Sequence, residues 1–238
     1  MNLALFDLDG TLLDGDTDGL WCEFLVDEGV LDRAGFEARN REILARYRAG
    51  AIEPAEFCAF YAGTLAGRTA AAWAPLRARF VASRVAPRIG APARELVARH
   101  RAARDRVVLT TATNRFLTEP VAGILGIGAA DLIATELETV GDRFTGRTTG
   151  ELNMRSGKVI RLAAWLHAQG QDASAMAEAT FYSDSANDLP LLRAVRRAVA
   201  VDPDADLRQE AERAGWPVLS LLAGRDEPLR AAPGAPIG

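Results

Sequence analysis

Short apolar runs that end in acidic or hydroxyl residues mark the predicted strands of this chain. Residues 3–6 (Leu-Ala-Leu-Phe) stop at Asp7, residues 106–111 end in two threonines, and residues 179–183 stop at Asp184. Largely apolar runs of this length are typical of strands that are buried on both faces. The sequence therefore predicts three buried strands. Two further strands are expected at 198–201 and 217–221.

Helical periodicity accounts for most of the remaining chain. From residue 18 to about residue 85, aromatic and aliphatic residues recur three or four positions apart, and Gly50 and Pro54 interrupt the pattern. We find no convincing strand in this stretch. Residues 132–140 and 143–148 flank Gly141-Asp142 and are predicted to form a hairpin. The other predicted helices cover residues 93–103, 117–125, 158–168 and 189–195.

Strands that alternate with helices predict an α/β fold with a doubly wound parallel sheet and a Rossmann-like core. The helical stretch after the first strand is too long to be a connecting loop. We interpret residues 16–86 as an inserted, all-helical cap domain. Residues 1–15 and 87–225 would then form the catalytic core. Residues 226–238 are rich in Pro, Gly and Ala and are predicted to be a flexible tail.

Composition and charge exclude several classes of function. The chain has 238 residues, of which 49% are hydrophobic and 25% charged, as in ordinary globular proteins. A net charge of −4 argues against nucleic-acid binding, and no segment has the ~18 consecutive apolar residues of a membrane span. Cys22 and Cys58 are too few for a disulfide scaffold and suggest buried thiols. We expect a cytoplasmic monomer or homodimer that binds neither nucleic acid nor membrane.

Two carboxylates follow the first predicted strand in the segment Asp7-Leu8-Asp9-Gly10-Thr11. Side chains two positions apart on an extended segment point to the same side, so Asp7 and Asp9 would meet. Two like charges about 4 Å apart repel by roughly 4 kcal/mol at an effective dielectric of 20. A nearby cation or a bound proton would relieve this repulsion. An acidic turn without a function is the alternative.

A second acidic group follows the third predicted strand. Asp184 and Asp188 supply oxygen atoms of the kind that Mg²⁺ prefers, although this segment could also simply cap the helix that follows. The carboxyl ends of parallel strands lie at one edge of a sheet, where such folds bind ligands. We therefore expect both residues to converge with Asp7 and Thr111 at that edge.

Lys158 begins a predicted helix in a chain that otherwise uses mainly Arg. A compact ammonium suits phosphate as a point charge, whereas an ordinary surface lysine is the alternative. A nucleotide-binding phosphate loop is excluded, because Leu152 and Val159 occupy the positions where that loop needs Gly and a hydroxyl residue. Thr111 would aim its hydroxyl at the same edge, and Thr110 is a competing assignment.

Together these four segments resemble the motifs of the haloacid dehalogenase superfamily of phosphatases. The segment from Asp7 to Thr11 resembles the first motif, Thr111 the second, Lys158 the third, and the segment from Asp184 to Asp188 the fourth. Their order agrees with the family over essentially the whole chain. The helical insert is similar to the cap of the phosphoserine-phosphatase-like branch, subfamily IB. The resemblance implies a magnesium-dependent phosphatase of small phosphorylated metabolites that forms an aspartyl-phosphate.

The resemblance also implies roles for the residues. Asp7 would attack phosphorus, and Asp9 would protonate the leaving group and then activate water. Lys158 and Thr111 would offset the charge of the phosphoryl oxygens. The groups that would hold Mg²⁺ are the Asp7 carboxylate, the Asp9 backbone carbonyl, Asp184 and, in a supporting position, Asp188.

The chain departs from phosphoserine phosphatases near the substrate. Asp16 aligns with the Glu at the start of their cap, and Thr111-Ala112-Thr113-Asn114 replaces a Ser-Gly-Gly-aromatic run. Their cap segment with an Arg followed by an Arg-Val pair has no counterpart. Phosphoserine and a histidinol-phosphate-like compound are both candidate substrates. The candidate substrate-binding residues are Asp16, Thr111, Ala112, Asn153 and Lys158, with Trp21, Glu23, Arg39 and Arg41 as further specificity candidates, of which Trp21 better suits the cap core.

Two other functions could use the same groups. A phosphotransferase would pass the phosphoryl group from Asp7 to an alcohol. A phosphorylatable switch of the receiver type would keep its phosphoryl group for long periods, and both the predicted cap and the acid/base residue Asp9 argue against it.

Overall fold

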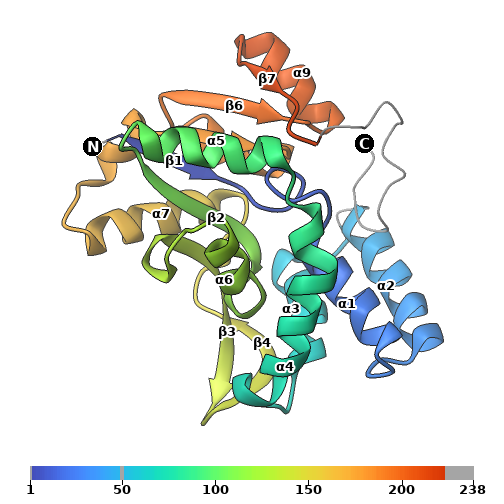
Figure 1. The fold of residues 1–238 in the computed structure, drawn as a ribbon. Helices are drawn as coiled ribbons and strands as arrows, with labels where there is room; N and C mark the ends of the chain where they lie inside the picture. The colour runs from blue at the N-terminus through green and yellow to red at the C-terminus, as the bar shows by residue number, and fades with distance from the viewer. Residues whose placement is uncertain (1, 49–50, 223–238) are drawn as a thin grey trace.

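A seven-stranded sheet forms the centre of the computed structural model, which describes residues 2–48 and 51–222 (Figure 1). The strand order is β4-β3-β2-β1-β5-β6-β7, and all neighbouring pairs are parallel except β3 and β4. The chain moves outward from β1 to β3 and returns to β5 on the other side of β1, which confirms the doubly wound α/β fold. The strands are β1 (Leu3–Phe6), β2 (Arg106–Asn114), β3 (Leu132–Val140), β4 (Arg143–Thr149), β5 (Thr180–Ser183), β6 (Arg197–Val201) and β7 (Val218–Leu219).

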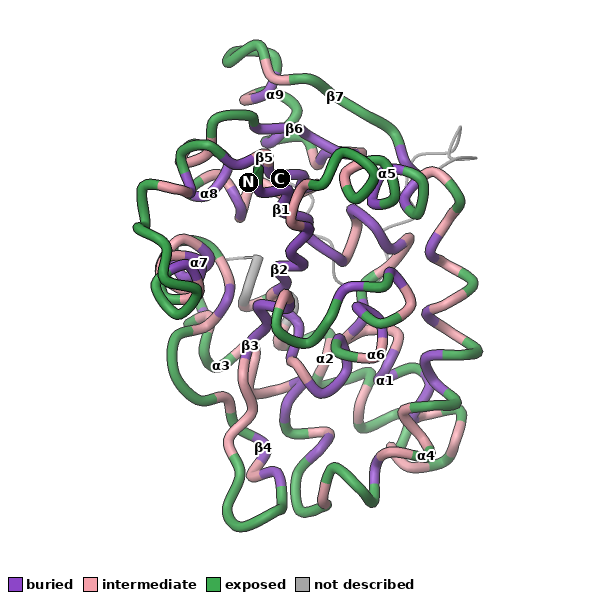
Figure 2. The backbone as a smooth tube through the Cα atoms, turned by 60° about the vertical axis from the view of Figure 1, so that its left-hand side comes forward, coloured by how far each residue is buried: buried purple, intermediate pink, exposed green. Residues whose placement is uncertain are grey.

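Alternate side chains of β1 enter two separate hydrophobic layers. Ala4 and Phe6 pack in the layer that includes α5 and α6, whereas Leu3 and Leu5 pack with α7, α8 and α9. Figure 2 shows α5 and α6 on one side of the buried strands and α7 on the other. Because both faces are covered, the strand is apolar at every position. These helices are α5 (Ala91–Ala102), α6 (Arg115–Ile124), α7 (Ser156–Ala168), α8 (Leu189–Leu192) and α9 (Ala205–Ala214).

Four α-helices are described between β1 and α5, and in Figure 1 they lie together below the core. Trp21 is fully buried among them, with its ring centre 5.7 Å from that of Trp73 and 5.1 Å from that of Phe80. Trp21 therefore belongs to the hydrophobic interior of the helical insert. The domain boundaries at residues 16, 87 and 226 stay predictions, and the predicted tail lies outside the described residues. The helices are α1 (Thr17–Asp27), α2 (Arg33–Arg48), α3 (Pro54–Ala62) and α4 (Ala70–Phe80).

The β3–β4 hairpin contacts the helical insert through backbone atoms. The Gly67 nitrogen donates to the Phe144 carbonyl at 2.8 Å, and the Phe144 nitrogen donates to the Arg68 carbonyl at 3.0 Å. A Cβ added to Gly146 in β4 would lie only 2.9 Å from the Cβ of Ala66. The absence of a side chain at residue 146 therefore lets the hairpin approach the insert closely.

Several element boundaries differ from the sequence-based predictions. Strand β2 extends three residues beyond Thr111, helix α8 ends at Leu192 rather than at residue 195, and β7 contains two residues instead of the five expected at 217–221. Both residues of β7 are exposed at the sheet edge, where less pairing and burial support a longer strand. Helix α9 was missed, because only Leu207 and Ala211 of its residues are buried and they mark too short an apolar stripe.

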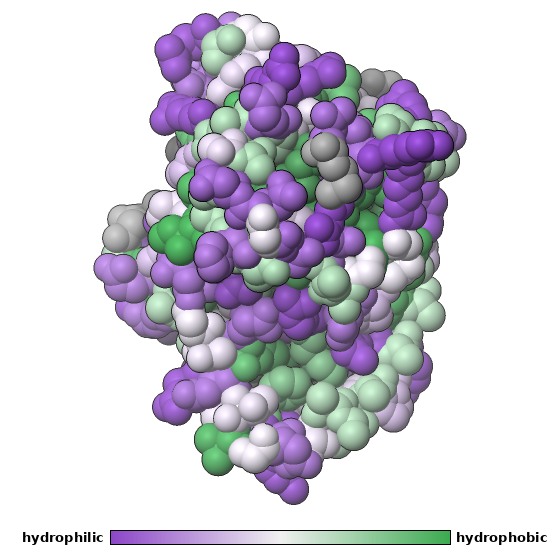
Figure 3. All heavy atoms as spheres, turned by 90° about the vertical axis from the view of Figure 1, so that its left-hand side faces the viewer, coloured by the Kyte–Doolittle hydropathy of each residue, from purple (hydrophilic) through white to green (hydrophobic). Residues whose placement is uncertain are grey.

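The described surface is polar, with few large apolar side chains exposed. The face drawn in Figure 3 is largely hydrophilic and is broken by smaller hydrophobic areas. None of the described helices has the length and apolar character needed to cross a membrane. The large hydrophobic residues that are exposed are Val140, Ile160, Val218 and Leu219.

We predict that Gly146→Ala weakens the contact between the hairpin and the helical insert. Gly146 and Gly141 both have positive φ, 84° and 62°, so alanine is strained at either position. Only at Gly146 would the new methyl group collide with Ala66. In urea unfolding, Gly146→Ala should lose at least about 1 kcal/mol more stability than the control Gly141→Ala. Equal losses would contradict the close approach.

Candidate active site

The carboxyl ends of β1, β2 and β5 bring the predicted site residues to one edge of the sheet. Phe6, the last residue of β1, pairs with Leu109 of β2 and with Tyr182 of β5. Asp7 and Asp184, which directly follow the neighbouring strands β1 and β5, therefore lie at nearly the same height along the sheet edge. The strand order changes direction at β1, and open α/β sheets bind their ligands at such a switch point.

Lys158 connects two buried carboxylates. Its Nζ atom lies 2.7 Å from Asp7 Oδ1 and 2.6 Å from Asp188 Oδ2. The exposed fractions of the three side chains are 3% for Lys158, 10% for Asp7 and 5% for Asp188. Ser183 Oγ also donates to Asp188 Oδ2, at 2.7 Å. Lys158 is thus not a surface lysine, and Asp188 holds it in place; the predicted contact of Asp188 with a metal stays a prediction.

The electrostatics of this group leave an excess of negative charge. Burial raises the pKa of Asp7 to about 7, although Lys158 opposes the shift. Burial alone would lower the pKa of Lys158, but Asp188 and Asp7 hold it above its usual range, so the ammonium stays charged. Burial and the charge of Asp7 raise the pKa of Asp184 well above its usual value. A divalent cation beside these carboxylates would relieve the repulsion.

The oxygen atoms present at this edge fit Mg²⁺. Asp184 Oδ1 accepts a hydrogen bond from Thr11 Oγ1 at 2.9 Å, and Asp184 Oδ2 faces Gly10, where an added Cβ would be only 2.2 Å away. No three His, Cys, Asp or Glu side chains within the described part of the chain form a metal cluster by themselves. The protein would supply Asp7, Asp184 and the Asp9 carbonyl. Mg²⁺ commonly binds one or two carboxylates and completes its shell with water and phosphate.

Asp9 is held by three threonines, one at the start of α1 and two in β2. Its Oδ1 atom accepts from the Thr17 nitrogen at 2.8 Å and also from the Thr17 hydroxyl. Its Oδ2 atom accepts from Thr113 Oγ1 at 2.9 Å and lies 3.5 Å from Thr111 Oγ1. Burial, with a contribution from Asp16, raises the pKa of Asp9 to about 6. A carboxyl group with a pKa near neutrality can both give and take a proton.

Asn153 is fully buried and bonds two neighbouring strands, β2 and β3. Its Nδ2 atom donates to Thr110 Oγ1 at 3.0 Å, to the Thr111 carbonyl at 2.9 Å and to the Ile133 carbonyl at 2.8 Å. The amide nitrogen of Asn153 is therefore already bonded to strand atoms, and the Thr110 hydroxyl bonds to Asn153 rather than to Asp9. The geometry therefore favours Thr111 over Thr110 as the phosphate-binding hydroxyl, and favours a positioning role for Asn153 over direct substrate binding.

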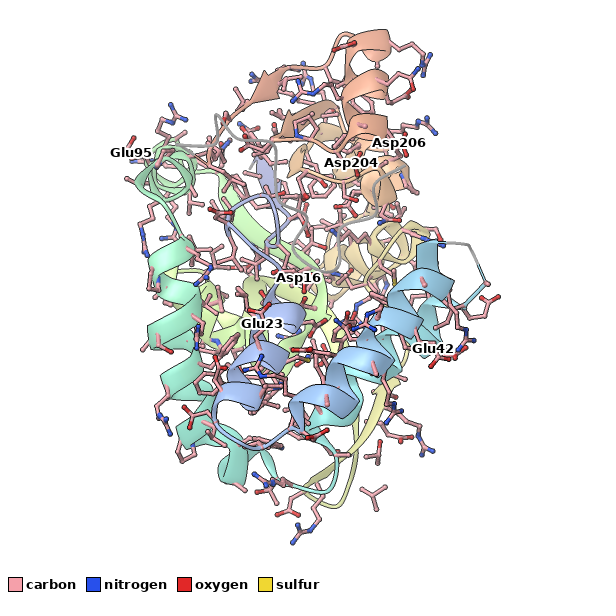
Figure 4. All side chains as sticks on the ribbon, turned by 90° about the vertical axis from the view of Figure 1, so that its right-hand side faces the viewer. Asp16, Glu23, Glu42, Glu95, Asp204 and Asp206 are labelled. Carbon is pink, nitrogen blue, oxygen red and sulfur yellow. The ribbon has the colours of Figure 1, made fainter. Side chains whose placement is uncertain are left out.

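The remaining predicted specificity residues lie on the helical insert. Asp16 precedes α1 and accepts a hydrogen bond from the Gly19 nitrogen at 2.6 Å. Figure 4 shows Asp16 at the start of α1 and Glu23 further along the same helix. Asp16, Glu23, Arg39 and Arg41 are all exposed, and the structure places the two arginines on α2. Their proposed roles in specificity stay predictions.

A comparison with known families shows the family of this chain. The family model described as haloacid dehalogenase-like hydrolase matches residues 4–193. The chain belongs to this family. The histidinol-phosphatase of Neisseria meningitidis serogroup C (strain 8013) is 40% identical over 221 residues, which are 92% of this chain and 99% of that protein. The phosphoserine phosphatase SerB1 of Mycobacterium tuberculosis (strain ATCC 25618 / H37Rv) is 31% identical over 232 residues, 93% of this chain and 71% of that protein.

Solved structures share the fold of this chain. A crystal structure of a protein with unknown function from Bordetella pertussis Tohama I has a TM-score of 0.87 and 40% identity, and the match covers 92% of this chain and 97% of that chain. A phospho-aspartyl intermediate analogue of phosphoserine phosphatase has a TM-score of 0.64 at 17% identity, with 92% of each chain covered, and it shares the fold. This haloacid dehalogenase-like hydrolase is thus an enzyme of the phosphatase class, as its sequence motifs predict.

Several residues that support the site of this hydrolase were not identified from the sequence. Thr17 and Thr113 donate to Asp9, and Thr11 donates to Asp184. Thr11 lies in the segment that resembles the first motif, Thr113 lies two positions after Thr111, and Thr17 lies at the start of the insert, and these placements are the signals that could have identified them. Ser183 was visible as the last residue of a predicted strand, but its bond to Asp188 was not.

A small cavity of about 10 Å³ lies between the helical insert and the tips of β2, β3 and β4. Ala112, which was predicted to contact substrate, is part of its wall. Cys58 also lines it and is half-buried, whereas the sequence suggested a buried thiol. The complete lining is Asp18, Cys58, Tyr61, Ala62, Ala112, Asn114, Thr135 and Thr148.

We predict that Gly10→Ala weakens Mg²⁺ binding by at least about 10-fold, as expected when the orientation of a metal ligand is lost. The new Cβ would lie 2.2 Å from Asp184 Oδ2, so the carboxylate has to move. Gly29→Ala is the control, because Gly29 has a φ of 69°, similar to the 77° of Gly10, but has no atom within 4 Å of the added Cβ. Titration calorimetry with MgCl₂ would measure the effect. An unchanged affinity in Gly10→Ala would contradict a role for Asp184 in the metal site.

Proposed function

We propose that this phosphatase is a magnesium-dependent phosphomonoester hydrolase that acts on a small phosphorylated metabolite through an aspartyl-phosphate on Asp7. The observation that carries the proposal is the convergence of Asp7, Asp9 and Asp184 at the switch point of the sheet, with the ammonium of Lys158 2.7 Å from Asp7 Oδ1. A nucleophile, an acid/base, metal-binding oxygens and a fixed cation are the groups that phosphoryl transfer requires.

In the first step, a carboxylate oxygen of Asp7 attacks the phosphorus atom of the bound ester. The bond between phosphorus and the leaving oxygen breaks, and Asp9 transfers its proton to that oxygen, so the alcohol leaves in neutral form. Asp7 now carries the phosphoryl group as a mixed anhydride. The four hydrogen-bond contacts that the threonines make with Asp9 fix the direction of its proton transfer.

In the second step, Asp9 is ionised and takes a proton from a water molecule. The water oxygen attacks phosphorus, the bond between phosphorus and the Asp7 oxygen breaks, and inorganic phosphate is released. Asp7 is restored as a carboxylate and Asp9 as a protonated acid, so the enzyme returns to its starting state.

The other groups of the site stabilise charge during both steps. Mg²⁺, when bound, would offset the negative charge of the phosphoryl oxygens and of Asp7. Lys158 supplies a second, fixed positive charge, which Asp188 and Ser183 hold in position. The Thr111 hydroxyl can donate a hydrogen bond to a phosphoryl oxygen. Because these donors are already oriented in a buried site, little reorganisation is needed during the reaction.

The names of the relatives supply two candidate substrates for this chain, histidinol phosphate and phosphoserine. The histidinol-phosphatase shares 40% of its residues with this chain along nearly its whole length, so it favours the first. A cytoplasmic location and a monomeric or homodimeric state stay predictions. Phosphoryl transfer to an alcohol and a phosphorylatable switch stay alternative functions.

We predict that Asp7→Asn lowers kcat for phosphate release by about 10³-fold or more, because the amide cannot act as the nucleophile. The measurement is a phosphate-release screen over phosphorylated metabolites, with Mg²⁺ and with EDTA. Asp172→Asn is the control, since Asp172 is exposed and its side chain bonds only to Ser174 in the described structure. Removal of Mg²⁺ should abolish turnover in both the wild type and this control.

Other outcomes of the same screen would overturn the proposal. Wild-type turnover in Asp7→Asn would exclude the covalent mechanism. A drop in free phosphate on addition of an alcohol, with a phosphorylated alcohol as the product, would identify a phosphotransferase. A phosphorylated protein that persists without turnover would identify a switch.

A further inference from the structure

A second cavity, with a volume of about 430 Å³, lies at the edge of the sheet opposite to the candidate active site. It is formed where β6 begins, between the ends of α8 and α9 and the segment that leads into β7. Asp7, in contrast, follows the carboxyl end of β1, and β1 and β6 run in the same direction. Binding pockets for small molecules usually have volumes of about 300–1,000 Å³, so this cavity is large enough for a ligand.

Positive charge is concentrated in the wall of this cavity, although the whole chain has a net charge of −4. Glu210 is the only acidic residue among the described residues that form the wall, whereas four are arginines. The arginines are Arg193, Arg196, Arg197 and Arg213, so the wall has a formal charge of +3, from four positive charges and one negative. In Figure 3, which views the molecule from the side where β6 begins, the uppermost part of the surface is mostly hydrophilic. A concave surface with an excess of one charge attracts small ligands of the opposite charge.

Glu210 holds two of these arginines at the cavity. Arg193 Nη2 donates to Glu210 Oε1 at 2.9 Å, and Arg213 Nη2 and Nε donate to Glu210 Oε1 and Oε2 at 2.7 and 2.8 Å. The hydrogen bonds from Arg213 and then Arg193 lower the pKa of Glu210 to about 2, so this carboxylate stays charged. A guanidinium has five N–H donors, and in the described structure the Nη1 nitrogen of neither arginine is bonded to Glu210. Both arginines are exposed, so a ligand can reach the remaining donors.

Arg196 and Arg197 add charge to the cavity and are held less firmly. Arg196 forms an ion pair with Glu178 at 2.8 Å, but both side chains are exposed. An ion pair so exposed to water is weak, so a phosphate group can replace Glu178 as the partner of Arg196. Arg197 is exposed at the first residue of β6. The cavity can therefore offer several guanidinium groups to one multiply charged anion.

Trp216 gives the cavity an aromatic wall. Its side chain is half-buried and packs against the hydrophobic layer that contains Leu192 and Ala198, which also line the cavity. The flat face of an indole ring can stack on another planar ring. Guanidinium groups bind phosphate well, because they can donate two parallel hydrogen bonds to its oxygen atoms. An aromatic surface beside several arginines therefore matches a ligand that joins a planar base to phosphate groups.

We propose that this cavity binds a nucleotide, with its base against Trp216 and its phosphate groups on Arg193 and Arg213. The nucleotide is a ligand here and not a substrate, because the carboxylates of the candidate active site lie at the opposite edge of the sheet. Phosphate without a base would not contact Trp216, and a base without phosphate would not pair with the arginines. Binding at this cavity does not depend on the proposed hydrolysis, so either one can fail while the other stands.

Titration calorimetry with ADP, adenosine and pyrophosphate tests the two halves of this site, with EDTA present to prevent turnover that depends on Mg²⁺. The wild type should bind ADP at least about 10-fold more tightly than adenosine, which lacks phosphate, or pyrophosphate, which lacks the base. Arg213→Gln should weaken ADP binding by about 10- to 100-fold, as expected for hydrogen bonds to a charged group. Trp216→Leu should weaken ADP binding by about 5-fold or more, because stacking is lost, and should leave pyrophosphate binding unchanged.

Arg208→Gln is the matched control, because Arg208 is exposed on the same helix, α9, and is not part of the cavity wall. It should leave the affinity for ADP unchanged, and cooperative urea unfolding shows that each variant is folded. Equal ADP affinities in the wild type, Arg213→Gln and Trp216→Leu would mean that ADP binds elsewhere, which overturns the inference. It is also overturned if pyrophosphate binds as tightly as ADP, or if the wild type binds hexaglutamate, an acidic peptide, but not ADP.

Discussion

The buried ammonium of Lys158, held between Asp7 and Asp188, is the interaction on which the arrangement of this site depends. A charged lysine whose side chain is 3% exposed would be strongly unfavourable without carboxylate partners, and both partners lie within hydrogen-bond distance. The lysine comes from the start of α7, whereas its partners follow β1 and β5. The three elements must therefore pack in the observed register for the charges to be compensated.

One lysine does not balance the carboxylates that surround it. Asp7, Asp184 and Asp9 all have raised pKa values, chiefly because they are buried. This local excess of negative charge is what a divalent cation and a phosphoryl group would complete. The described site thus holds buried carboxylates whose negative charge a bound cation would neutralise.

The sequence predicted the parts of the fold and the site that depend on local order. An apolar run that stops at an acid identified Asp7 and Asp184, because a parallel sheet brings its strand ends to one edge whatever the details of packing. Lys158 was found from its residue type and the resemblance of the motifs. Helix α9 was missed, because its narrow apolar face can be recognised only in the folded structure, where it packs against the sheet.

The most direct test of the covalent account combines Asp9→Asn with a substrate that needs no leaving-group protonation. With p-nitrophenyl phosphate, this variant should still transfer the phosphoryl group to Asp7 but should activate water poorly. Rapid mixing should give a burst of about one equivalent of p-nitrophenolate per enzyme, and mass spectrometry of the acid-quenched protein should locate the phosphoryl group on Asp7. A phosphoryl group on another residue, or steady turnover without a burst and without a phosphorylated protein, would contradict the account.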